Sequence, residues 1–213
     1  LLSNTTRSLD PAGGTLSQAL GIVNGAVFSD LDGDRFPELI VATEWGPVRV
    51  FKNQQGTFSE VTEALGLGGL TGLWQGVATG DFDGDGRIDI VATNWGLNSS
   101  LRPNVINPPR LHYNFTDSSV PTSLILAAWD ERLKQYLPSR DLPALFRGYP
   151  GLRGVFQSHR EFAGAGVLKL MDHHPSPARS VTAAVLQSMV FLNRKEGFEP
   201  KPLPPEAHLS PAF

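Results

Sequence analysis

Short apolar and β-branched runs, separated by turns rich in glycine, proline and aspartate, dominate this chain. One unit places the β-branched run at residues 39–43 directly after an acidic turn, and then a hairpin at residues 50–53 that closes on Phe58. Strand and turn signals that alternate at this short spacing predict antiparallel strands rather than long helices. We therefore expect an all-β chain built from four-stranded units of about 50 residues each.

The unit repeats along the chain, and the copies extend beyond the turn. The acidic turn at residues 30–34 returns at 81–85, and the Val-Ala-Thr-Glu-Trp-Gly sequence at 41–46 returns as Val-Ala-Thr-Asn-Trp-Gly at 91–96. A fixed period of this kind indicates a repeat architecture in which neighbouring units share a core. Four-stranded units that repeat in this way are typical of β-propeller blades.

The hairpin is the second repeated element. The pattern Val-Phe-Lys-Asn at 50–53 returns as Val-Phe-Leu-Asn at 190–193, and residues 2–4 resemble an earlier copy. About three blades are visible, fewer than the four or more that close a ring. We therefore interpret residues 1–213 as a fragment of a β-propeller, an incomplete ring that is truncated at both ends.

One segment has a different character. Residues 139–179 contain two helix-start patterns, at Ser139 and at Ser158, and a set of apolar residues that can form one face: Leu142, Leu145, Phe146, Phe156 and Phe162. Several prolines keep any helices short. We expect a small helical insertion here, between the second and third strands of the third blade.

The acidic turns carry the candidate chemistry. In each loop, carboxylates stand at positions 1, 3, 5 and 9, with a residue at position 7 that offers only its carbonyl oxygen; the ligand sets are Asp30, Asp32, Asp34, Phe36 and Glu38, and Asp81, Asp83, Asp85, Arg87 and Asp89. Calcium takes six to eight oxygen ligands, and alternate residues of a tight loop converge on one point. The spacing therefore predicts two Ca²⁺ sites, and the lack of nitrogen and sulfur ligands argues against zinc or copper.

The two loops differ at position 6, where a sharp turn needs a left-handed residue. The second loop has Gly86 there and the first has Arg35, which costs on the order of 1 kcal/mol in that conformation. We expect the first site to be the weaker or the more strained of the two. The simpler alternative is that both Asp-Gly turns only mark solvated hairpins.

A third loop copy begins at Asn114, where Asn, Thr and Ser replace most of the acids. We expect this loop to turn by hydrogen bonding and to bind no metal.

Charge and composition narrow the function. The chain has 18 Lys and Arg against 21 Asp and Glu, a formal net charge of −3, without a basic stripe, so we expect no nucleic-acid partner. The absence of cysteine excludes disulfides and thiolate catalysis. No apolar run approaches the roughly 20 residues of a membrane helix, so we expect no membrane span.

Other candidate groups are weaker. The tryptophans at 45, 74 and 95 follow the repeat and are expected to pack, whereas Trp129 is unpaired in the repeat and more open to a binding role. His173 and His174 lack a second metal-ligand pair at helical spacing. The sequence contains no nucleophile elbow, zinc-protease motif or phosphate loop, so we expect a protein that is not an enzyme.

At the acidic loops the sequence resembles the FG-GAP/VCBS repeats of integrin-alpha-type propellers. Residues 72–81, 94–98 and 202–207 resemble bacterial members associated with ASPIC/UnbV modules, which are also akin to the cartilage acidic protein group. The departures are Arg35 and the degenerate loop at Asn114, which affect the metal count rather than the fold.

The resemblance implies a secreted, periplasmic or cell-surface propeller in which calcium stabilises the blades and loops bind an unidentified protein or carbohydrate. Two alternatives remain open. One is a polysaccharide-acting or cofactor-binding propeller enzyme with carboxylates or His173 and His174 at its mouth. The other is an adhesion module whose calcium bridges to a ligand carboxylate.

Overall fold

A computed structural model describes residues 20–114, 123–148, 153–156, 158–172 and 179–208. The chain divides into two compact units. Unit 1 comprises Leu1–Trp95 together with Gln187–Phe213, and unit 2 comprises Gly96–Leu186. In sequence, unit 2 is therefore an insertion within unit 1. The expected hairpin copy at residues 2–4 lies outside the described residues.

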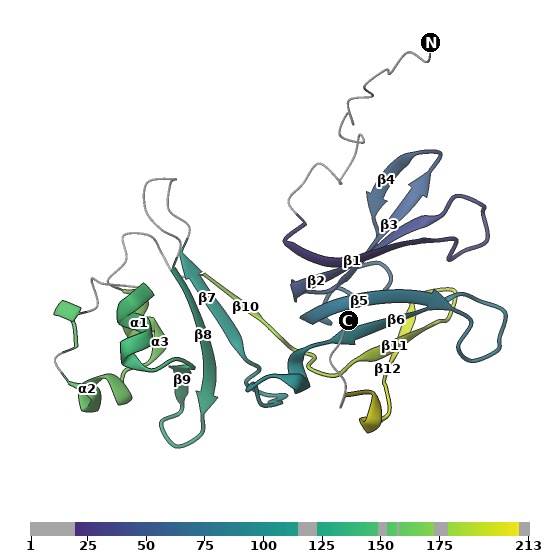
Figure 1. Cartoon of the computed structure of the whole chain (residues 1–213). Coiled ribbons are helices and arrows are strands. Elements are labelled where there is room, and N and C mark those ends of the chain that lie inside the picture. The colour runs from purple at the N-terminus through teal and green to yellow at the C-terminus, as the bar shows by residue number, and fades with distance from the viewer. Residues whose placement is uncertain (1–19, 115–122, 149–152, 157, 173–178, 209–213) are drawn as a thin grey trace, which may run out of the picture. The chain divides into compact units, whose positions relative to one another are not determined.

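Unit 1 is all antiparallel sheet (Figure 1). Its strands are β1 (Ile22–Ser29), β2 (Glu38–Gly46), β3 (Val48–Gln54), β4 (Thr57–Glu60), β5 (Gly72–Gly80), β6 (Asp89–Asn94), β11 (Met189–Asn193) and β12 (Phe198–Pro202), followed by a 3-10 turn at Pro205–His208. Pairing follows chain order in two four-stranded meanders, β1–β2–β3–β4 and β5–β6–β11–β12, and a short β2–β5 pairing at Glu44↔Leu73 joins them into one eight-stranded sheet. Each meander has the strand order expected of one blade.

The second meander corrects the expected blade count. The sequence repeat predicts that the hairpin β11–β12 belongs to a third blade, but β11 pairs with β6 in the register Met189↔Ala92, so it completes the second. The similarity between the two hairpins is then the similarity between the third strands of two successive meanders. The described residues form no closed propeller.

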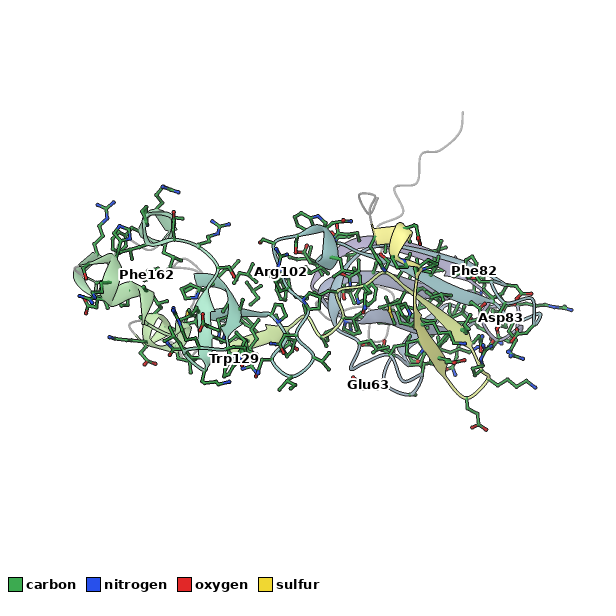
Figure 2. The ribbon with its side chains drawn as sticks, turned by 90° about the horizontal axis from the view of Figure 1, so that it is seen from below. Glu63, Phe82, Asp83, Arg102, Trp129 and Phe162 are labelled. Carbon is green, nitrogen blue, oxygen red and sulfur yellow. The ribbon has the colours of Figure 1, made fainter. Side chains whose placement is uncertain are left out.

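The core of unit 1 explains the apolar repeats. Trp74, Phe51 and Phe191 are fully buried, and Trp74 meets Phe191 edge to face with ring centroids 5.7 Å apart. Trp74 is thus packed as expected, whereas Trp95 is half exposed. The loop between β5 and β6, which carries Phe82 and Asp83, lies at one end of the strands (Figure 2).

Close backbone contact joins the first strands of the two meanders. A Cβ on Gly25 of β1 would lie 3.2 Å from the Gln75 carbonyl oxygen and 3.3 Å from the Gly76 Cα of β5. Gly25 and Gly76 are the glycines that match in the sequence repeat, so the repeat places a residue without a side chain at this contact.

Unit 2 is a separate mixed structure. It contains a 3-10 turn (Gly96–Asn98), β7 (Arg110–Asn114), β8 (Ser123–Asp130), β9 (Gln135–Pro138), α1 (Leu142–Gly148), α2 (His159–Ala163), α3 (Val167–Met171) and β10 (Arg179–Thr182). The four strands pair in the order β10-β7-β8-β9. All three helices fall within residues 139–179, but they follow β9 and precede β10, in a unit of their own rather than in a blade shared with β11.

One of the two predicted helix starts, Ser158, is confirmed, and the other lies two residues later than predicted. Ser158 caps α2 by accepting a hydrogen bond from the Glu161 N–H at 3.2 Å, as the Ser158 pattern predicts. For α1 the cap is Asp141, whose carboxylate accepts from the Ala144 N–H at 2.9 Å, so the helix begins after Ser139. Of the expected apolar residues, Leu142, Leu145 and Phe156 are buried in one core cluster, and Phe146 and Phe162 are partly buried and pack against it. The mostly β fold is confirmed, while the assignment of residues 1–213 to one propeller fragment stays a prediction.

Candidate metal-binding loops

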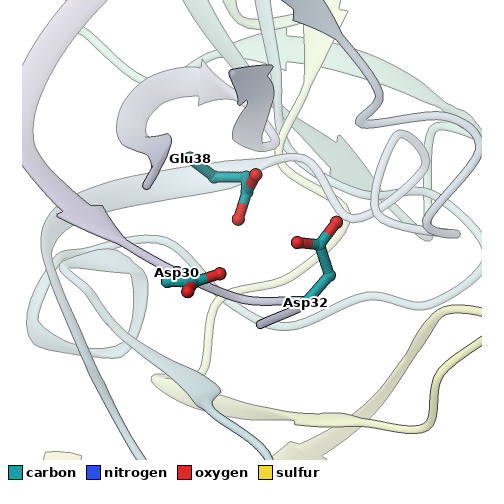
Figure 3. A group of neighbouring side chains, drawn as sticks. All are labelled: Asp30, Asp32 and Glu38. Carbon is teal, nitrogen blue, oxygen red and sulfur yellow. The ribbon is translucent and has the colours of Figure 1, made fainter. Parts of the chain in front are cut away.

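The first loop connects β1 to β2 and turns around Asp30. The two carboxylate oxygens of Asp30 accept hydrogen bonds from the Gly33 N–H at 2.8 Å and the Arg35 N–H at 2.9 Å. Carboxylate oxygens of Asp30, Asp32 and Glu38 lie within 4.8 Å of one another and face a common space (Figure 3). This is an oxygen-only cluster of the kind that hard cations bind.

The second loop, between β5 and β6, repeats this geometry. Asp81 accepts hydrogen bonds from the Gly84, Asp85 and Gly86 N–H groups at 2.8, 3.1 and 3.0 Å. Carboxylate oxygens of Asp81, Asp83 and Asp85 lie within 4.8 Å of one another. Position 1 therefore organises the backbone of both loops, and each loop holds three carboxylates that could share one cation.

The acid at position 9 has the same structural role in both loops. Glu38 accepts a hydrogen bond from the Leu31 N–H at 2.8 Å, and Asp89 accepts one from the Phe82 N–H at 2.8 Å. Each acid therefore connects the end of its loop to the residue at position 2. Both side chains are buried. Asp89 also accepts the Asn193 N–H at 2.8 Å and lies outside the second carboxylate group, whereas Glu38 belongs to the first.

The left-handed residue at position 6 is confirmed in both loops. Arg35 has a φ of 73° and Gly86 a φ of 84°. An arginine in this region carries a steric cost that a glycine does not. The first loop therefore holds backbone strain that is absent from the second.

A lysine that the ligand pattern did not include lies within the first cluster. The Lys52 ammonium of β3 contacts the carboxylates of Asp32 and Asp34, and its Nζ lies 3.2 Å from Glu38 Oε1. Partial burial acts to lower the pKa of Lys52, but the hydrogen bonds to these carboxylates outweigh it and raise the pKa. The ammonium is thus charged at neutral pH and neutralises part of the first cluster.

Arginines contact the second cluster. Arg194 Nη1 lies 2.7 Å from Asp83 Oδ2 and 3.0 Å from Asp85 Oδ2, and Arg87 contacts Asp85. The hydrogen bond from Arg194 is the main cause of a lowered Asp83 pKa. The Arg87 and Arg194 side chains are about one third exposed, whereas the Lys52 side chain is 21% exposed.

Two asparagines in equivalent repeat positions fix the loops to the hairpins. The Asn53 amide donates to the Pro37 carbonyl at 3.0 Å, and the Asn193 amide donates to the Ile88 carbonyl at 3.2 Å. Asn193 also donates to the Leu31 carbonyl of the first loop at 2.9 Å. One side chain therefore links the two acidic loops within unit 1.

Asn193 and Arg87 line a cleft of about 490 Å³ together with Asp30 and Asp32. The shared Asn at the end of each hairpin motif was the sequence signal for this link, and Lys52 stands one residue before the first of them. An acidic ligand pattern does not predict this link, because Lys and Asn are not members of such a pattern.

The remaining candidate residues divide into two groups. Asp34 contacts Lys52 but falls outside the first carboxylate group, and the roles of the Phe36 and Arg87 carbonyl oxygens as ligands stay predictions. Residues 115–118 of the third loop copy, and His173 and His174, lie outside the described residues.

Comparison with known proteins supports the repeat at this site. Residues 30–92 match the family model of the FG-GAP-like repeat. A stretch of 76 residues is 34% identical to cartilage acidic protein 1 of Xenopus tropicalis, covering 35% of this chain and only 11% of that protein. The comparison with solved structures found no significant match. An FG-GAP-like repeat, typically a ligand-binding scaffold, is therefore shown for part of the chain, and the ASPIC/UnbV association stays a prediction.

Proposed function

We propose that this chain is a calcium-binding, non-catalytic scaffold of the propeller-repeat type, located outside the cytoplasm, whose loops bind a protein or carbohydrate partner. The observation that carries the proposal is the pair of acidic loops with the same internal hydrogen bonds, each with three carboxylates that could share one ion. The FG-GAP-like match over residues 30–92 supports a scaffold role. No helix among the described residues is long and apolar enough to cross a membrane.

The second loop fits a calcium ion well. Asp81, Asp83 and Asp85 supply oxygen ligands from a backbone that is already folded by Asp81. Gly86 takes the left-handed conformation without strain. Bound calcium would neutralise carboxylates that otherwise repel one another, and would tie the loop to itself.

The first loop fits less well because its left-handed position 6 is Arg35 and not glycine, which adds backbone strain. Both clusters also contain a cation that competes with a metal ion: the Lys52 ammonium contacts Asp32 and Glu38 of the first, and Arg194 contacts Asp83 and Asp85 of the second. We therefore assign the stronger calcium site to the second loop. For comparison, extracellular calcium modules bind with dissociation constants of about 10⁻⁴–10⁻³ M.

Calorimetric titration of the folded chain with CaCl₂ tests the proposal. Asp83→Asn should remove the stronger site, because it withdraws a ligand charge but leaves the backbone bonds of Asp81 in place. Glu206→Gln, an exposed residue distant in sequence from either loop, is the control and should leave uptake unchanged. A folded chain that takes up no calcium at millimolar concentration, or an Asp83→Asn variant with undiminished uptake, would refute the metal-binding proposal.

The non-catalytic part of the proposal has its own test. Unmodified chain should show no turnover that depends on substrate when incubated with polysaccharides. A rate that is present in the unmodified chain and lost in Asp83→Asn, at equal thermal stability, would favour the enzyme alternative instead.

A further inference from the structure

Unit 2 contains a pocket of about 530 Å³ that lies outside the calcium loops. Arg110 and His112 of β7 line it, together with Trp129 of β8, Tyr136 of β9 and the glycines at 164 and 166 that precede α3. Figure 2 shows Trp129 among the side chains of this unit. Its volume falls in the range of roughly 300–1,000 Å³ typical of small-molecule sites.

The charge of the lining has one sign. Four of the lining residues are cationic and none is acidic; the cations are Arg110, Lys134, Lys169 and Arg179. Lys134 is paired with Glu131 at 2.9 Å on the exposed β8–β9 turn, and Glu131 is not part of the lining. The pocket therefore favours a ligand with negative charge.

Unpaired donors gather in the same place. Among the described residues, four buried side-chain polar atoms lack a hydrogen-bond partner, and three of them belong to residues that line this pocket: Arg110 Nε, His112 Nε2 and Trp129 Nε1. Arg110 Nε and Trp129 Nε1 carry only a proton to donate, and His112 Nε2 donates in one tautomer. Buried polar groups in proteins are normally paired, so this concentration points to an acceptor from outside the chain.

Each donor has a distinct local setting. His112 is 4% exposed, and burial, with Arg110 nearby, lowers its pKa, so the ring is neutral at pH 7. The hydrogen bond from Lys134 is the main cause of a lowered Glu131 pKa, and a hydrogen bond from Trp129 is a further cause, so the Trp129 N–H has the Glu131 carboxylate beside it. Arg110 Nε is thus the charged donor with the clearest lack of a partner.

Aromatic packing holds these groups in position. The Arg110 guanidinium lies over the Tyr136 ring, 4.2 Å from its centroid, and the Tyr136 hydroxyl donates to the Pro108 carbonyl at 3.1 Å. Trp129 and His112 both contact the same ring edge to face. A donor set fixed in this way loses little conformational entropy when a ligand binds.

We propose that this pocket binds a small oxyanion, either free or as the acidic group of a sugar ring, with Arg110, His112 and Trp129 as donors. A carboxylate or sulfate group accepts several N–H donors at once. The pocket is larger than one such group needs, and the indole of Trp129 offers an apolar surface for a ring. Because the pocket lies in unit 2, the proposal does not depend on calcium binding in unit 1.

A ¹H–¹⁵N NMR titration of the full chain tests the site directly, because the Arg110 Nε–H and Trp129 Nε1–H groups give their own signals. The probes are glucuronate, sodium sulfate and neutral glucose. We expect glucuronate, sulfate or both to shift these two signals, together with the amides of Gly164 and Gly166. Glucose should bind at least tenfold more weakly than the effective anion.

The probes also separate the two sources of the anion. A response to glucuronate alone assigns an acidic sugar, and a response to sulfate assigns the oxyanion itself. Arg110→Gln should weaken binding about tenfold or more, since it removes a charge-assisted hydrogen bond. Arg132→Gln removes the same charge from an exposed residue outside the lining and should have no effect.

The proposal fails if no probe shifts the two side-chain signals at millimolar concentration. It also fails if glucose shifts them as strongly as glucuronate, since the charge would then have no role. The signal shifts are measured in unmodified chain, so the test stands even if Arg110→Gln does not fold.

Discussion

Replacing Lys52 with methionine should destabilise the metal-free chain and strengthen calcium binding at the first loop. The substitution keeps most of the aliphatic length of the side chain but removes the ammonium that contacts Asp32, Asp34 and Glu38. One change therefore separates two roles of the same positive charge: an internal counter-ion without metal, and a competitor when metal is present.

The contact with Glu38 determines the size of the effect. Asp32 and Asp34 are 51% and 39% exposed, and solvent screening makes such pairs weak. Glu38 is 3% exposed, and loss of the partner leaves its Oε1 without an ionic contact. A fully buried carboxylate in this state costs about 3–5 kcal/mol, but Glu38 keeps the Leu31 N–H, so we expect roughly 2 kcal/mol.

Urea unfolding followed by circular dichroism, in EDTA and in calcium, measures both effects. In EDTA the variant should unfold at lower urea, by the roughly 2 kcal/mol derived from Glu38. In calcium the deficit should shrink, because removing one positive charge beside a divalent ion strengthens its binding roughly tenfold. Lys201→Met, which breaks one exposed pair with Glu199, is the control and should cost less than about 0.5 kcal/mol.

The outcome in EDTA decides the argument. If Lys52→Met and Lys201→Met were equally stable in EDTA, the ammonium would not be a counter-ion of the first cluster. If calcium binding at the first loop were unchanged by Lys52→Met, the ammonium would not compete with the metal ion there.

Four further substitutions test other parts of unit 1. Glu60→Gln should cost about 1–2 kcal/mol in urea unfolding at pH 7, because Glu60 binds Arg49 through two hydrogen bonds of 2.8 and 2.5 Å. The Arg49 hydrogen bond lowers the Glu60 pKa, so the stabilisation is present above the ordinary pKa of a glutamate, and the difference from unmodified chain should disappear as the pH falls through the lowered pKa. Arg35→Gly should raise the free energy of unfolding by about 0.5–1 kcal/mol in EDTA, while Gly86→Ala should lower it by a similar amount. If Arg35→Gly does not stabilise the chain, or Gly86→Ala does not destabilise it, position 6 carries no backbone strain. Gly25→Val should cost about 1–3 kcal/mol in thermal unfolding, since its Cβ would meet β5 backbone at 3.2 Å, and an unchanged melting temperature would show that the two strands can separate freely.

Local features of the fold could be predicted from the sequence because the residues that determine them are neighbours in the chain. The left-handed position of Arg35 follows from its place in the turn, and the Ser158 cap follows from the Glu that stands three residues later. The carboxylate clusters follow from alternate spacing in a tight loop. Each of these needs only a few residues of context.

Strand pairing across a long insertion could not be predicted in the same way. The β11–β12 hairpin resembles β3 and β4 in sequence, and β11 does have the same place in its meander as β3. The resemblance does not show which second strand of a meander the hairpin pairs with. A partner from a new blade and a partner from before the insertion satisfy the same apolar pattern. Because unit 2 separates β6 from β11 in the sequence, the order of the elements favours a new blade. In the structure, the Asn193 N–H donates to Asp89, the first residue of β6, so β11 pairs with the strand that precedes the insertion.

The hydrogen bonds of Asn193 also connect the position of β11 to the candidate metal sites. Asn193 bonds to Asp89 and Ile88 in the second loop and to Leu31 in the first, so β11 is part of the candidate metal region as well as of the sheet. The hydrogen bonds that Asn193 makes to the two loops therefore form only when β11, which follows unit 2 in the sequence, pairs with β6. It follows that calcium binding should report on correct docking of β11, even though every predicted carboxylate precedes unit 2 in the sequence.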